Sequence, residues 1–170
     1  MNNRLIGLAG LAQSGKDTVG GYMEGFHRLA FADALKSVAY DTDVDIATIV
    51  DEVGWERAKA EYPHVRPFLQ RLGVAMREHV SGDVWVVAAL SQMYEGNNYV
   101  ITDVRFPNEY RAIVHGGGKV WRVERPGIVA PNGHISETAL DGYGFDQVVE
   151  NNGTLDDLRV QVQELLNVPV

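Results

Sequence analysis

The sequence contains no cysteine among its 170 residues, which excludes disulfide bonds and thiolate-bound metal centres. Its five histidines are scattered, and none follows the H-E-x-x-H spacing that places two ligands on one helix face. No apolar run reaches the ~18 residues typical of a membrane span. The first residues also lack the charged-then-apolar pattern of a signal peptide. These absences predict a cytoplasmic protein that has no membrane partner.

Basic residues are also scarce, since 15 Lys and Arg stand against 23 Asp and Glu, for a formal net charge of −8. This balance argues against binding to nucleic acid, which needs a basic surface to neutralise phosphates. Only four of the basic residues are Lys and eleven are Arg, whose forked guanidinium suits phosphate contacts. A small anionic ligand, bound where positive charge is concentrated, remains compatible with this composition.

The stretch GLAQSGKDT, residues 10–18, nearly matches the phosphate-binding pattern G-x-x-x-x-G-K-[ST]. It follows a short apolar run, residues 4–10, and precedes a helical pattern from Lys16 to Phe26, which is the context that the motif requires. Its glycines allow backbone N–H groups to point inward at a phosphate, and Lys16 adds a positive charge. We therefore expect a phosphate loop rather than a plain turn with an exposed lysine.

Asp17 departs from the pattern, because many such loops carry a hydroxyl here that ligates Mg²⁺. Its carboxylate could bind the metal directly or through water, or could only complement the first turn of the helix. Thr18, one residue later, offers a hydroxyl to the phosphates. The departure lowers the odds of a GTPase or a motor-type ATPase.

Short apolar runs alternate with helical patterns along the chain. We expect strands at 4–10, 28–32, 98–102, 119–125 and 145–149, and helices at 16–26, 34–43, 67–80, 83–94, 108–114 and 155–166. The valines in 83–94 leave a strand as the alternative there. Asp33 is the expected N-cap of the second helix, Pro67 the first residue of the third and Thr154 the cap of the last. Residues 41–63 are acidic and only weakly periodic. The alternation predicts an α/β protein with a mostly parallel sheet of about five strands covered on both faces.

A second acid, Asp103, follows the apolar run YVIT, where a carboxylate could reach Mg²⁺ or a substrate hydroxyl, and Arg105 lies two residues further on. The alternative for Asp103 is a turn or helix-cap residue. Arg122 and Arg125 precede a Gly- and Pro-rich segment, where they could stabilise a phosphoryl group or serve as strand-edge charges. Ligands of α/β sheets gather at the carboxyl ends of strands, which favours the functional interpretation of Asp103.

On the helix after His64, a turn of ~100° per residue brings Arg66, Gln70, Gly73 and Arg77 onto one narrow stripe. This stripe could bind a phosphate through its arginines and a base edge through Gln70, with Gly73 giving close access. The alternative is an ordinary solvent-exposed edge beside the apolar face of the helix. Arg66 precedes a proline, so it could also lie outside the helix.

Seven motifs, in order along nearly the whole chain, resemble the deoxynucleoside monophosphate kinase family, best known from bacteriophages. They are GLAQSGKDT, LAFADALK, VRPFLQRLG, ITDVRFPNE, WRVERPG, HISE and VVENNGTLDDL. The resemblance implies one P-loop kinase domain over 1–170, with the three-layer P-loop NTPase fold. Its core would be 1–32 and 97–170, with an acceptor-binding helical insertion at about 33–95 and a lid at about 126–137. The cytoplasm would be that of the host if a phage encodes the protein.

The resemblance also implies transfer of the ATP γ-phosphoryl group to a deoxynucleoside 5′-monophosphate, with Mg²⁺, and G-K-D-T is the form of the loop expected in this family. It assigns ATP to Gly10, Ser14, Gly15, Lys16, Asp17, Thr18, Asn151, Asn152 and Gly153, and the metal to Asp17 and Asp103. It assigns catalysis to Lys16, Asp103, Arg105, Arg122 and Arg125, and the acceptor to Asp33, Lys36, Arg66, Gln70 and Arg77.

Two other functions compete with this one. The first is a P-loop kinase for another phosphorylated small molecule, such as dephospho-coenzyme A or phosphomevalonate. The second is an ATP-sensing module without catalysis, for which the arginines are more numerous than needed. The sequence leaves open the accepted bases, the choice between deoxyribose and ribose, the role of residues 41–65 and the oligomeric state, with a homodimer among the options.

Overall fold

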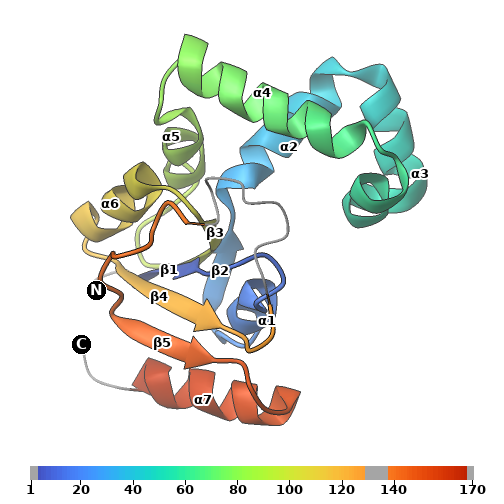
Figure 1. The fold of residues 1–170 in the computed structure, drawn as a ribbon. Helices are drawn as coiled ribbons and strands as arrows, with labels where there is room; N and C mark the ends of the chain where they lie inside the picture. Colours follow the sequence, from blue (N-terminus) through green and yellow to red (C-terminus); the bar gives the residue numbers. More distant parts are fainter. Residues whose placement is uncertain (1–3, 129–137, 168–170) are drawn as a thin grey trace. The chain divides into compact units, whose positions relative to one another are not determined.

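The structure is a computed structural model, and it describes residues 4–128 and 138–167 (Figure 1). Contacts between Cα atoms divide the chain into two compact units. The first unit combines residues 1–30 with residues 93–170, and the second unit is residues 31–92. We describe each unit separately.

The first unit is built on a parallel sheet. Its strands are β1 (Leu5–Ala9), β2 (Phe26–Leu29), β3 (Asn98–Val104), β4 (Lys119–Glu124) and β5 (Gln147–Glu150). They lie in the order β2-β3-β1-β4-β5, and all four pairings are parallel. The carboxyl ends of all the strands therefore meet at one edge. The predicted α/β class, with about five mostly parallel strands, is confirmed.

Helices cover both faces of this sheet. On one face, α1 (Lys16–Gly21) and α7 (Leu155–Asn167) supply Val19, Leu158 and Val162 to a core with strand residues such as Leu8 and Trp121. On the other face lies α6 (Pro107–His115), because a Cβ added at Gly7 would meet the side chain of Ile113. All five residues of β1 are buried, as expected for a central parallel strand.

Several boundaries in the first unit differ from the sequence prediction; strand β5, for example, begins at Gln147 and not at Phe145. Helix α1 ends at Gly21, and Phe26 begins β2 instead of continuing the helix. Strand β2 ends at Leu29, so the predicted strand at 28–32 is displaced. Asp103 lies within β3 and not just beyond it. Boundaries are set by hydrogen bonds to neighbouring strands, which local apolar patterns do not reveal.

The second unit contains only helices: α2 (Phe31–Thr42), α3 (Val44–Glu61), α4 (Val65–His79) and α5 (Val84–Leu90). Ala39, Ile46, Ala58, Val65 and Leu69 form its buried cluster. Within the same unit, the indole Nε1 of Trp85 donates to the carbonyl oxygen of Gly73 at 3.3 Å. Among residues 4–128 and 138–167, no helix combines the length and the apolar character needed to cross a membrane.

The starts of two helices in this unit differ from the sequence prediction. Helix α2 begins at Phe31, so Asp33 lies in its first turn and is not the N-cap. Helix α4 begins at Val65, which makes Pro67 its third residue and places Arg66 inside the helix. A proline is tolerated there because the N–H groups of the first turn have no partner within the helix.

Helix α3 occupies most of the stretch 41–63, for which the sequence predicted no element. Asp43 caps it, accepting a hydrogen bond from the N–H of Ile46 at 3.0 Å. Gly54, with φ 75° and ψ 163°, breaks the helix internally. The break interrupts the 3.6-residue period, which explains why the apolar pattern was too weak to detect.

Candidate active site

Residues 10–15 connect β1 to α1 through an unusual backbone conformation. Gly10, Gln13 and Gly15 all have positive φ values, of 142°, 65° and 102°. A Cβ at Gly10 would lie only 2.3 Å from the carbonyl oxygen of Val123. The loop therefore needs glycine at position 10 for both conformation and space.

Lys16, the first residue of α1, is only 7% exposed. Its Nζ donates to the carbonyl oxygens of Gly10 at 2.8 Å and of Leu11 at 2.7 Å, so the ammonium group lies across the loop. Ser14 Oγ is buried and has no hydrogen-bond partner within the part of the chain that the structure describes. A buried positive charge and an unsatisfied hydroxyl at one loop fit an anionic ligand.

Two arginines reach the start of this loop from the neighbouring strands. Ala9, the last residue of β1, is in register with Val104 of β3 and with Arg122 of β4. Arg105 follows Val104 directly, and it lines one small cavity together with Gly10 and Arg122. The sheet thus brings together three segments that are far apart in the sequence.

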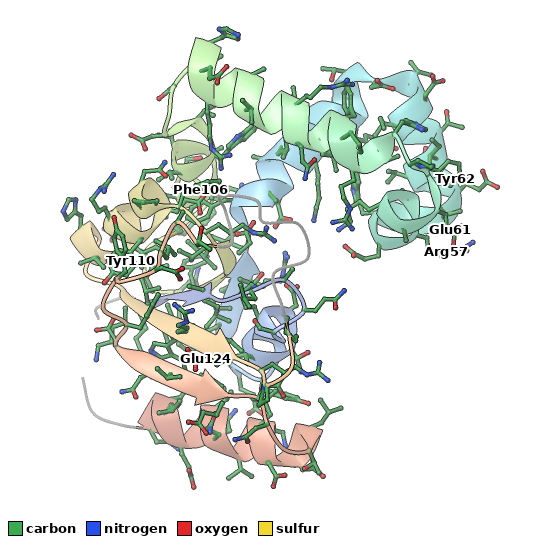
Figure 2. All side chains as sticks on the ribbon, in the orientation of Figure 1. Arg57, Glu61, Tyr62, Phe106, Tyr110 and Glu124 are labelled. Atoms are coloured by element: carbon green, nitrogen blue, oxygen red, sulfur yellow. The ribbon has the colours of Figure 1, made fainter. Side chains whose placement is uncertain are left out.

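The backbone before α6 is held by Glu109. The buried Glu109 carboxylate accepts hydrogen bonds from the N–H of Arg105 at 2.7 Å and from the N–H of Phe106 at 3.0 Å. Phe106 and Tyr110, at the start of α6, are marked in Figure 2. Glu109 thereby fixes the turn from which Arg105 projects, a role that the sequence analysis missed. The sequence feature that could have revealed this role is an acid at the third position of a helix that begins with Pro107, which is typical of a capping box.

Arg122 has three neighbours at the carboxyl end of β4. Its Nε lies 3.0 Å from Glu124 Oε1 and its Nη1 lies 3.9 Å from Asp141 Oδ1. Its guanidinium also sits over the ring of Phe145, 5.3 Å from the centroid. These contacts hold the guanidinium in a defined position beside the loop.

A larger cavity of about 460 Å³ opens next to the loop, within the first unit. Its lining comes from Leu11, Ser14, Arg122, Val123, Glu124, Arg125, Pro126, Ile128, Glu150 and Asn152. Glu124 marks its position at the end of β4 in Figure 2. The volume falls in the range of small-molecule sites.

The three residues after β5 have different surroundings. Asn151 Nδ2 donates to the carbonyl oxygen of Ser14 at 2.9 Å, and its N–H donates to the carbonyl oxygen of Glu124 at 2.7 Å. Asn152 lines the larger cavity and donates to Glu150 Oε2 at 3.1 Å. Gly153 precedes the cap of α7, where Thr154 and Asp157 bond reciprocally, as predicted for Thr154. Asn151 therefore ties the phosphate loop to the end of β4.

The acids proposed as metal ligands lie at the same end of the sheet. Asp17, in the first turn of α1, has an exposed side chain, and Thr18 is exposed beside it. Asp103 is half-buried in β3. The described residues contain no group of three or more His, Cys, Asp or Glu that could hold a metal ion. This donor set fits Mg²⁺, which takes one or two carboxylates and completes its shell with phosphates and water.

The residues assigned to an acceptor lie in the second unit. Lys36 Nζ pairs with Asp33 Oδ1 at 3.5 Å across one turn of α2. Arg66 and Gln70 are exposed on α4, Arg77 is half-buried, and Gly73 is buried rather than open. Of the stripe predicted from the helical period, Arg66 and Gln70 are therefore exposed, Arg77 is partly accessible, and Gly73 offers no open surface.

A separate ion pair in this unit lies on α3, where Arg57 Nε donates to Glu61 Oε1 at 2.8 Å (Figure 2). The hydrogen bond from Arg57 lowers the pKa of Glu61 and raises that of Arg57. Within the expected lid at 126–137, Pro126, Gly127 and Ile128 are described, whereas residues 129–137, including the HISE motif, lie outside the described residues.

The parallel sheet, the glycine loop with its lysine and the arginines at the same edge define a P-loop α/β protein. A family model described as "Deoxynucleotide monophosphate kinase" matches residues 36–162, and the chain belongs to that family. The chain is therefore a kinase, a phosphotransferase enzyme. The match begins after residues 10–18, so the assignment of the phosphate loop depends on its own pattern and geometry.

Individual relatives are distant. A protein of Acanthamoeba polyphaga mimivirus named "Putative deoxynucleotide monophosphate kinase" is 28% identical over 187 residues, covering 93% of each chain. "Uncharacterized protein ORF77" of Ictalurid herpesvirus 1 (strain Auburn) is 33% identical over 114 residues, which cover 62% of this chain. This chain spans only 50% of that protein's length. A solved structure from Chloroflexus aurantiacus, described as "a putative kinase", shares the fold with a TM-score of 0.50 at 13% identity, covering 99% of this chain and 98% of that one.

Proposed function

We propose that this chain transfers the γ-phosphoryl group of ATP to a deoxynucleoside 5′-monophosphate, giving the diphosphate and ADP. The observation that carries the proposal is the convergence of the phosphate loop, Arg105 and Arg122 at one edge of the sheet. Ligands of parallel α/β sheets bind at the carboxyl ends of the strands, and together with the family match this supports placing the reacting phosphates at this edge.

In this proposal, Lys16 and the loop N–H groups bind the outer phosphates of ATP, and the cavity beside Asn152 and Arg125 receives the nucleoside. Arg105, Arg122 and Arg125 stabilise the charge that spreads over the transferred group. Asp17 and Asp103 would hold Mg²⁺, which neutralises phosphate charge when bound. The acceptor phosphate is already anionic, so catalysis needs positioning and electrostatics more than a general base.

Acceptor binding is assigned to Asp33, Lys36, Arg66, Gln70 and Arg77 of the second unit. Family membership supports this assignment, and so does the presence of two exposed polar side chains on α4 that could contact a nucleotide. The one-domain organisation, with a helical insertion and a lid, remains part of the same proposal. We also propose a cytoplasmic location and no nucleic-acid or membrane partner, and a homodimer stays open.

The deciding experiment is an assay of ADP release with Mg²⁺-ATP and a panel of acceptors. The panel contains the deoxynucleoside and ribonucleoside monophosphates, dephospho-coenzyme A and phosphomevalonate. We expect turnover that depends on a deoxynucleoside monophosphate and stops when EDTA is added. Turnover only with one of the other acceptors would replace the proposed substrate, and ATP binding without acceptor-dependent turnover would favour a sensor.

A further inference from the structure

Asp17 stands where most phosphate loops carry serine or threonine, and two side chains hold its carboxylate. Thr102 Oγ1 donates to Asp17 Oδ1 at 2.9 Å, and Arg28 Nη2 lies 3.6 Å from the same oxygen. Thr102 is 2% exposed on β3, and Arg28 lies on the adjacent strand β2. The positions of both groups are therefore fixed by the sheet.

The pair formed by Asp17 and Thr102 exchanges the usual positions of two functional groups. In P-loop NTPases, a hydroxyl on the loop and a carboxylate on a strand serve the metal together. Here the loop carries the carboxylate and β3 carries the hydroxyl. Both contacts are made to Asp17 Oδ1, and the side chain of Asp17 is 79% exposed. One oxygen of Asp17 is thus held, and the carboxylate remains accessible to a ligand.

The exchange adds a negative charge to a loop that would bind a polyphosphate, and like charges repel. Arg28 lies on the same carboxylate and offsets this charge, although both side chains are substantially exposed, at 47% and 79%. The packing of α1 keeps the carboxylate near β3, because a Cβ at Gly20 would lie 2.7 Å from Thr102 Cγ2. A residue larger than glycine therefore does not fit at position 20 of α1.

We propose that Thr102 and Arg28 are positioning residues for Asp17. Thr102 orients the carboxylate so that Oδ2 faces the bound metal nucleotide, and Arg28 compensates the charge that aspartate adds to the loop. This inference rests on the proposed function, because it assumes that the loop binds ATP. It explains how a G-K-D loop works without the usual hydroxyl.

The first test compares Thr102→Val with Thr102→Ser by measuring the Kd for ATP by calorimetry, with Mg²⁺ and with EDTA. We expect Thr102→Val to raise the Kd for Mg²⁺-ATP about 3- to 10-fold, the range expected when one hydrogen bond that positions the carboxylate is lost. Thr102→Ser keeps the hydroxyl and should stay near the wild type, and in EDTA the variants should be alike. Equal shifts in both variants, or a shift that persists in EDTA, would overturn the role of Thr102. Melting temperatures without ligand confirm that each variant is folded.

The second test is a double-mutant cycle on the same Kd. Arg28→Met should raise the Kd about 2- to 5-fold in the wild type, the range of an exposed ion pair. In an Asp17→Ser background, which restores the usual hydroxyl, Arg28→Met should have no effect because no added charge remains. An equal effect in both backgrounds would overturn the role of Arg28. Arg159→Met on α7 is the matched control. If the wild type itself fails to bind ATP, the proposed function fails instead.

Discussion

The phosphate loop at residues 10–18 and helix α4 (Val65–His79) both carry cations assigned to phosphate, but they hold them differently. In the loop, positive φ values at Gly10, Gln13 and Gly15 impose a special backbone, and Lys16 is buried against it. In α4 the backbone is an ordinary amphipathic helix, and Arg66 projects into solvent. The loop is preorganised for an anion, whereas α4 offers side chains that must still be ordered by a ligand.

The cations of the loop and of α4 therefore differ in how much side-chain entropy they lose when a ligand binds. The side chain of Lys16 is already ordered by two carbonyl oxygens in the folded protein, so it loses little further entropy when a ligand binds. An exposed arginine loses side-chain entropy on binding, which reduces its net effect. Substitutions in the loop should therefore have larger effects than substitutions in α4.

The largest effect is expected for Lys16→Ala. Removing the charge that would contact the transferred phosphates should lower kcat at least about 100-fold, the cost of losing one transition-state donor. Steady-state kinetics with Mg²⁺-ATP and the preferred monophosphate measure it. Arg159→Ala, which removes an exposed cation from α7, is the control and should retain wild-type activity. A near-normal kcat in Lys16→Ala would remove Lys16 from the site.

Gly10→Ala tests whether the loop backbone is as constrained as its geometry indicates. The new Cβ would lie 2.3 Å from the Val123 carbonyl oxygen at a φ of 142°, so we expect a loss of about 3 kcal/mol in the free energy of unfolding. The control, Gly25→Ala, has φ 78° and nothing within 4 Å, and should cost about 1 kcal/mol. Urea denaturation measures both, and equal losses would contradict the close approach at Gly10.

Arg77→Ala tests the acceptor assignment of α4. Loss of a phosphate contact should raise the KM for the monophosphate about 10-fold and leave the KM for ATP nearly unchanged. Arg71, which is exposed on the same helix, provides the matched control Arg71→Ala. A larger change in the KM for ATP than for the monophosphate would move Arg77 out of the acceptor site.

Gly73→Ala tests whether position 73 of α4 only packs against its neighbours or also gives the acceptor close access to the helix. A Cβ here would lie 3.5 Å from Leu35 Cδ2, an ordinary contact, so the variant should gain about 0.5–1 kcal/mol in the free energy of unfolding. Gly7→Ala in β1 is the counterpart, because its Cβ would lie 2.5 Å from Ile113 Cδ1 and should destabilise the protein. Because Gly73 is buried, the KM for the monophosphate should stay near the wild-type value, and a rise in this KM would show that Gly73 gives the acceptor close access.

The smallest effect concerns the cap of α7. Hydrogen bonds from the side chain and backbone of Thr154 lower the pKa of Asp157. A carboxyl whose folded pKa is depressed adds stability above its unfolded pKa, and this stability is lost as the pH falls through the folded pKa. Thr154→Ala should raise the pKa of Asp157 toward its ordinary value, which NMR titration detects. An unchanged pKa would show that the side chain of Thr154 is not the main cause.

Much of the first unit could be predicted from local patterns. The glycine loop, the apolar strands and the Thr154 cap depend on neighbouring residues in the chain, so their signals are present in the sequence. Helix α3 was missed because Gly54 interrupts its period. The burial of Gly73 was missed because a helical wheel gives angles but not the partners that cover each side.

Local patterns were enough to identify the α/β class and the phosphate-loop motif, since periodicity and turn chemistry are properties of neighbouring residues. Three sets of contacts became visible only in the folded chain: Thr102 and Arg28 with Asp17, Glu109 with the turn at Arg105, and Asn151 with Ser14. These contacts join residues brought together by strand order and register. The physical reason is that side-chain hydrogen bonds act over about 3 Å in space, whatever the separation along the chain.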